Sequence, residues 1–196
     1  MRKLLARLGR KRLERESPTG RERQGVRVEG GTRVGLLVPA SSYIQRIQLR
    51  DLIIGMDEMG DDLDWSMVVD TGMKRKAHTR SRAQRIQKIG GGLEVPPEFP
   101  QRSQMVLFWR DECNAFGLPT DIPKKVAGVD VLLSLDADQS SLPLQAMMKR
   151  SNAGFKVGPM HAEDGTLDFM LTWPDGGDML SFVQLALHYL KTLDLK

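Results

Sequence analysis

The segment Arg33-Val-Gly-Leu-Leu-Val-Pro39 decides the fold class of this chain. It is a short apolar run that ends at a proline, which is typical of a strand buried on both faces of a sheet. Ser41 or Ser42 can cap a helix after it, and this helix carries one buried stripe of residues at helical spacing: Leu49, Leu52, Ile53 and Met56. We therefore expect a strand that leads directly into an amphipathic helix.

A second strand is predicted near residues 65–69, after an acidic turn. Strand, helix and strand in this order predict a βαβ unit whose crossover is right-handed. Farther along the chain, QMVLFW, VDVLLSL, GFKVG and TLDFMLTW are predicted strands, and LPLQAMMKR and DMLSFVQLALHYLKTL are predicted helices. The whole pattern predicts a single three-layer α/β domain of the Rossmann-like or flavodoxin-like kind, with a mostly parallel sheet.

Length and composition agree with one domain preceded by a tail. The 196 residues suffice for one hydrophobic core, and we expect a basic, partly helical tail at 1–29 and the α/β domain at 30–196. The single cysteine, Cys113, precludes an intrachain disulfide, so a reducing cytoplasm is the expected compartment. Apolar runs such as Val129 to Leu135 are far shorter than the roughly 20 residues that cross a bilayer.

Positive charge is concentrated in two blocks. Residues 1–29 hold ten Lys or Arg against four Glu, and residues 74–88 hold seven Lys or Arg and no carboxylate, whereas the rest of the chain carries 12 basic and 21 acidic side chains. Such segregation favours a polyanion partner, because clustered cations displace counterions from phosphates. The residues expected to bind nucleic acid are Arg7, Arg10, Lys11, Arg12, Lys74, Arg75, Lys76, Arg80, Arg82, Arg85 and Lys88.

Other uses of the same charge remain open. No aromatic residue lies within 74–88, so we expect contacts to phosphate and little base discrimination. The partner would be RNA or a ribonucleoprotein, or alternatively an acidic protein. The acidic turn at 57–64 could instead neutralise the second block within the molecule, in which case its charge would serve folding.

The second half of the chain resembles a family of small bacterial cytosolic proteins of unknown function. The resemblance covers roughly residues 105–195, and it is carried by the strand near 130–135, by AGFKVG at 153–158, by LDFM at 167–170 and by the leucine-spaced last helix, with a weaker echo in DECNAFGLP. It implies the α/β fold and brings no activity. A looser similarity links DVLLSLD and AGFKVG to part of heptosyltransferase-type enzymes, but those need a second domain for which this chain has no room.

An enzymatic alternative uses the loop after the VDVLLSL strand. Asp136, Asp138 and Ser140 lie there, and the carboxyl ends of parallel strands are where α/β proteins bind ligands. These residues could form the site of a small-ligand or phosphate-processing enzyme, although the sequence shows no further catalytic residues at the spacing that such an enzyme needs. Neither a cofactor nor a metal site is predicted, because the three histidines and one cysteine have no zinc-binding spacing. Cys113 is expected to be a structural thiol.

Overall fold

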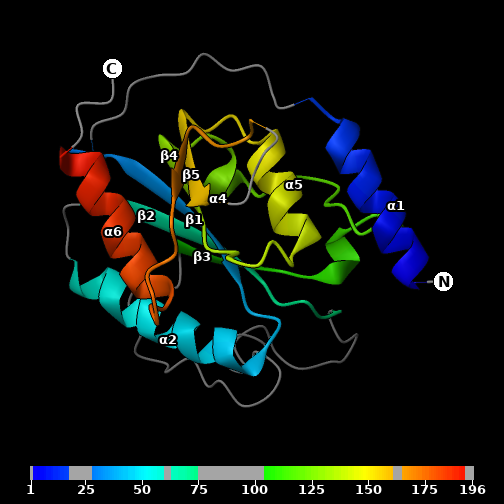
Figure 1. Cartoon of the computed structure of the whole chain (residues 1–196), viewed down its shortest axis with the longest axis horizontal. Helices are drawn as coiled ribbons and strands as arrows, with labels where there is room; N and C mark the ends of the chain where they lie inside the picture. Colours follow the sequence, from blue (N-terminus) through cyan, green and yellow to red (C-terminus); the bar gives the residue numbers. More distant parts are fainter. Residues whose placement is uncertain (1, 18–27, 60–62, 75–103, 161–164, 193–196) are drawn as a thin grey trace.

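Six parallel strands form the sheet in the computed structural model, which describes residues 2–17, 28–59, 63–74, 104–160 and 165–192 (Figure 1). In space the strands follow the order β3-β2-β1-β4-β5-β6, so the chain reverses direction across the sheet between β1 and β4. Their bounds are β1 Arg33–Pro39, β2 Asp64–Asp70, β3 Met105–Phe108, β4 Val131–Ser134, β5 Phe155–Pro159 and β6 Phe169–Leu171. This is the strand order of the doubly wound Rossmann fold.

The strand β1 lies at the centre of the sheet. Leu36 pairs in register with Met67 of β2 on one side and with Leu133 of β4 on the other. All of β1 except Arg33 is buried. A continuous apolar strand is stable there because helices cover both faces, so no side chain of the strand needs to face water.

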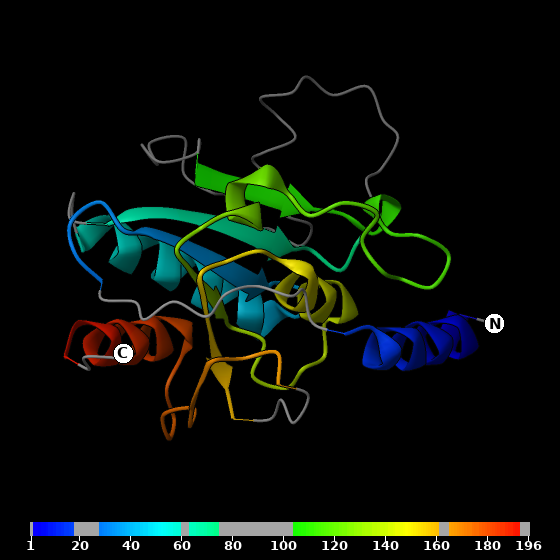
Figure 2. The same cartoon turned by 90° about the horizontal axis from the view of Figure 1, so that it is seen from above.

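Two layers of helices cover the sheet. One face packs against α2 (Tyr43–Glu58) and α6 (Met179–Thr192), and the other packs against α4 (Lys124–Ala127) and α5 (Leu142–Arg150). The helix α1 (Arg2–Arg15) lies outside α5, at the opposite end of the molecule from α6 (Figures 1 and 2). A single turn of 3-10 helix, Arg110–Glu112, follows β3.

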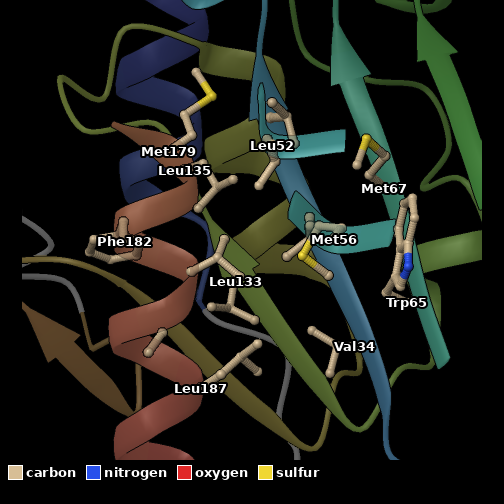
Figure 3. Close-up of a cluster of buried hydrophobic side chains, with 14 of the residues drawn as sticks. Val34, Leu52, Met56, Trp65, Met67, Leu133, Leu135, Met179, Phe182 and Leu187 are labelled. Atoms are coloured by element: carbon tan, nitrogen blue, oxygen red, sulfur yellow. The ribbon is translucent and has the colours of Figure 1, made fainter. Parts of the chain in front are cut away.

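The larger half of the core lies between the sheet and the α2–α6 layer (Figure 3). Side chains from both helices point at the strands and are almost fully buried, and burial of each one stabilises the fold by about 1.5–3 kcal/mol. The residues labelled in Figure 3 include Val34, Leu52, Met56, Trp65, Met67, Leu133, Phe182 and Leu187. The sheet and its helices are therefore held as one body.

Serine side chains begin the two helices that follow β1 and β4. The Ser42 hydroxyl accepts from the Gln45 amide, and the Gln45 side chain accepts from the Ser42 amide, which completes a capping box. The Ser141 hydroxyl accepts from the Leu144 amide at the start of α5. Both caps supply acceptors for amides that have no partner within the helix.

The predicted fold class is confirmed, and the sheet is wholly parallel among the described strands. The βαβ unit, the predicted strands and the last helix are all present near the expected positions. Three strands are shorter than predicted, since the runs QMVLFW, VDVLLSL and TLDFMLTW form strands only over Met105–Phe108, Val131–Ser134 and Phe169–Leu171. Residues 75–88 of the second basic block lie outside the described residues.

Candidate functional site

The basic helix α1 is attached to the body of the protein through α5. Gly9 and Leu13 are its buried residues, and Leu13 packs with Leu118 and Ala146. A β-carbon on Gly9 would overlap with the backbone carbonyl oxygen of Phe116, so only glycine permits this close approach. Leu4 and Leu8 lie outside this docked face, because they are 60% and 44% exposed.

An ion pair holds the end of α1. The Nε and Nη2 atoms of Arg150 donate to the two carboxylate oxygens of Glu16, each at 2.7 Å. The same guanidinium donates to the Pro119 carbonyl at 3.1 Å. The hydrogen bonds from Arg150 lower the pKa of Glu16, against a smaller opposing effect of burial. A planar fork that meets both oxygens fixes the orientation of α1 as well as its position.

The docking of α1 directs its remaining basic side chains to solvent. Arg7, Arg10, Lys11 and Arg15 are exposed, and so is one acid of the same helix, Glu14. Among the residues that the structure describes, none of these four cations is paired with a carboxylate. They form a positive surface on a fixed helix, which we call the α1 basic face.

Two other residues of the predicted nucleic-acid site are described. Arg12 is exposed and lies over the ring of Phe116, 5.8 Å from its centroid, so it also contributes to the docking of α1. Lys74 is exposed shortly after β2. The rest of the second basic block lies outside the described residues: Arg75, Lys76, Arg80, Arg82, Arg85 and Lys88.

The alternative ligand site lies at the carboxyl edge of the sheet, next to the point where the strand order reverses. Asp136 follows β4 there and is only 2% exposed. One of its oxygens accepts from the amide and hydroxyl of Ser140, and the other accepts from the Ser141 amide at 2.8 Å. Burial raises the pKa of Asp136, and these hydrogen bonds partly offset the effect.

Asp136 therefore has a structural role within its own loop, because both of its carboxylate oxygens accept hydrogen bonds from the turn that leads into α5. The structure brings Asp136 and Ser140 together, whereas Asp138 is exposed. No group of three side chains within the described ranges could hold a metal ion.

A buried contact at this edge was missed from the sequence. The Ser141 hydroxyl donates to Asp70 at 2.6 Å, and Asp70 is 6% exposed. The other oxygen of Asp70 accepts from the Gly72 amide. Asp70 ends β2 and Ser141 begins α5, which are 71 residues apart in the chain, so only the strand order brings them together.

Cys113 and His188 have environments that differ from those of catalytic groups. Cys113 is half-buried, and burial is the first cause that raises the pKa of its thiol to about 11, with a smaller contribution from Asp70. A high pKa disfavours the reactive thiolate. The side chain of His188 is exposed on α6.

Part of the chain is similar to a known family, and this similarity brings no activity. Residues 127–193 match a family of unknown function (DUF6913), which confirms the resemblance over β4 to α6. The match does not extend to DECNAFGLP or to either basic block. No curated protein and no solved structure matches the chain. Among the described helices, none is long and apolar enough to cross a membrane.

Proposed function

We propose that this protein binds a polyanion, RNA or a ribonucleoprotein, without catalysing a reaction on it. The observation that carries the proposal is the α1 basic face. Four exposed cations project from a helix whose other side is docked by Gly9, Leu13 and the Glu16–Arg150 pair. A fixed helix presents its charges without the ordering cost that a disordered tail would incur on binding.

The chemistry of this face suits phosphate more than bases. Its polar groups are guanidinium and ammonium ions, which contact phosphate oxygens without reading sequence. The exposed apolar side chains beside them are leucines, which offer no ring on which a base can stack. Binding should therefore weaken steeply with salt, by roughly 0.7–0.9 logarithmic units per tenfold rise in salt for each neutralised phosphate.

The arrangement at the carboxyl edge supports the enzymatic alternative less well. Asp136 is only 2% exposed, and its hydrogen bonds to Ser140 and Ser141 hold it within its own loop, so a ligand in solution has little access to it. Asp138 and Ser140 are exposed and remain able to contact a ligand. Because Asp136 is engaged within its loop, we assign the proposed function to the α1 basic face and not to the carboxyl edge.

A mobility-shift titration with a homopolymeric RNA at two salt concentrations tests the proposal. The informative variant is Arg7→Gln with Lys11→Gln on α1, and the matched control is Lys124→Gln with Lys125→Gln on α4, which removes the same charge from another exposed site. We expect the α1 variant to weaken binding roughly tenfold or more at moderate salt, and the control to change it little.

Three results would overturn the proposal. These are no binding at low salt, binding that does not respond to salt, and equal weakening by the two double variants. A protein that co-purifies after nuclease treatment, and whose binding requires Arg7 and Lys11, would instead identify an acidic protein as the partner.

A further inference from the structure

The outer side of α1 carries leucines as well as cations. Leu4 and Leu8 are 60% and 44% exposed. Positions 4, 8, 11 and 15 follow one another at helical spacing, so Lys11 and Arg15 continue the line of the two leucines along one side of the helix. The buried residues of α1 lie on the opposite side. The side that faces solvent is therefore apolar in its first half and basic in its second half.

The two leucines have no part in the interactions described so far. They offer neither a charge nor a hydrogen bond to a phosphate, and they lie outside the face that docks α1 on the body. A single exposed leucine is ordinary on a protein surface. Two leucines one turn apart and bordered by cations are instead typical of an amphipathic helix that lies in the interface of an anionic membrane.

The position of α1 allows a flat surface to reach it. Among the described elements, α1 is the outermost helix at its end of the molecule, beyond α5 and far from α6 (Figures 1 and 2). Its outer residues are exposed along the helix, which is about 21 Å long for 14 residues. A protruding, convex helix of this kind can lie against a plane without any rearrangement of the fold.

Charge distinguishes between the possible partners of this side. A second copy of the chain would bring two α1 basic faces together, and like charges oppose that contact. A neutral membrane would engage the leucines alone, and two partly exposed side chains bury less apolar surface than a myristoyl chain, which itself binds only marginally. An anionic membrane is negative at its surface and apolar beneath it, so it complements both halves of the helix.

We propose that the outer side of α1 binds an anionic membrane surface. Leu4 and Leu8 enter the boundary between headgroups and acyl chains, and the cations contact the lipid phosphates: Arg7, Lys11 and Arg15. Each cation near an anionic surface strengthens binding roughly fivefold, so the cations and the leucines contribute together. The inference goes beyond RNA binding, because it assigns a function to the leucines, although the two ligands share the same cations.

Vesicle sedimentation tests the proposal. The protein is mixed with vesicles of phosphatidylcholine and phosphatidylglycerol, or with vesicles of phosphatidylcholine alone. The informative variant is Leu4→Gln with Leu8→Gln, and the matched control is Ile44→Gln with Ile47→Gln on α2. The control residues are 67% and 43% exposed, so the two variants remove similar exposed apolar surface, and Gln keeps a high helix propensity in both.

We expect the wild type to bind the anionic vesicles and not the neutral ones. The leucine variant should bind the anionic vesicles about tenfold more weakly, because less apolar surface enters the membrane, and the control should bind as the wild type does. The proposal would be overturned by a wild type that binds neither kind of vesicle or binds both equally. Equal loss in the two variants, or no loss in the leucine variant, would also overturn it.

An RNA mobility shift with the same variants separates this inference from the proposed function. Leu4→Gln with Leu8→Gln keeps every cation of α1, so it should bind RNA as the wild type does. Vesicle binding without RNA binding would remove only the proposed function, and the reverse result would remove only the membrane inference. Equal loss of RNA and vesicle binding in the leucine variant would show that the leucines act through the fold, which would overturn the inference.

An environment-sensitive dye reports the insertion of α1 directly. In a Cys113→Ser background, Leu8→Cys carries an NBD label, and the control Lys191→Cys places the same label at an exposed position on α6, at the opposite end of the molecule. With anionic vesicles, we expect the emission to shift to shorter wavelength for the label at position 8 and to stay unchanged for the label at position 191. A shift at both positions, at neither, or at position 191 alone would overturn the proposal.

Discussion

Arg150 donates two hydrogen bonds of 2.7 Å to Glu16, one to each carboxylate oxygen. This ion pair connects the residue that follows α1 to the last residue of α5. Its two partners are 134 residues apart in the chain. The pair turns a basic tail into a fixed part of the surface.

Removal of the Glu16 charge should loosen α1. In Glu16→Gln the charge-assisted pair is lost, at a cost of about 1 kcal/mol for a partly exposed site. The amides of α1 should then exchange with solvent roughly fivefold faster, as measured by hydrogen exchange. Glu14→Gln removes an exposed carboxylate from the same helix and serves as the control. Equal exchange in the two variants would contradict the role of the pair.

The contribution of Glu16 should also depend on pH. Its pKa is lowered in the folded protein by Arg150, so its stabilising contribution is present above the unfolded value of about 4.3 and is lost as pH falls through the lower folded pKa. The difference in α1 exchange between the wild type and Glu16→Gln, after correction for intrinsic exchange rates, should therefore shrink from pH 6 to pH 3. Asp136, whose pKa is raised, contributes with the opposite sign, but it is common to both proteins and cancels in the difference. A difference that stays constant to pH 3 would count against the ion pair.

Gly9→Ala should weaken the docking of α1, although it favours the helix itself. An exposed Gly→Ala change in a helix normally stabilises it by about 1 kcal/mol. At Gly9 the added β-carbon would meet the Phe116 carbonyl oxygen, which belongs to the backbone and cannot rotate away. We expect faster exchange of the α1 amides and no gain in Tm. Ala6→Gly, at an exposed position, calibrates the propensity effect alone.

Ser141→Ala should destabilise the whole fold. The substitution removes the donor to the buried Asp70 oxygen and the acceptor for the Leu144 amide, at a combined cost of about 1–3 kcal/mol. For a chain of this size we expect Tm to fall by about 3–10 °C. Ser140→Ala changes an exposed serine whose amide still donates to Asp136, so its Tm should change much less. Similar shifts for the two variants would show that the Asp70 contact is unimportant.

Cys113 should react slowly with alkylating reagents in the folded protein. A thiol pKa of about 11 leaves about 0.1% thiolate at pH 8, and the side chain is half-buried. Mass spectrometry after iodoacetamide treatment should show little modification until urea unfolds the chain. Rapid alkylation of the native protein at pH 8 would contradict the assignment of Cys113 as a structural thiol.

The sequence predicted the elements well where local pattern and burial agree. The continuous apolar run from Arg33 to Pro39 predicted a strand buried on both faces. The structure confirms it, since every residue after Arg33 is buried. The helix α6 was predicted from leucine spacing for the same reason, since one stripe faces the core. A three-residue strand such as β6 was overestimated, because the apolar pattern continues past the point where pairing with β5 stops.

Within the candidate sites, the sequence alone determined the inventory of charge: two basic blocks, one acidic body, one cysteine and a loop with Asp136 and Asp138. Only the tertiary structure decided that α1 is docked by Glu16 and Arg150, and that Ser141 reaches Asp70 across the edge of the sheet. The physical reason is the separation of the interacting residues along the chain. Periodicity and capping act between residues three or four apart, whereas these contacts join residues 71 and 134 positions apart, which only the order of the strands and the packing of α1 on α5 bring together.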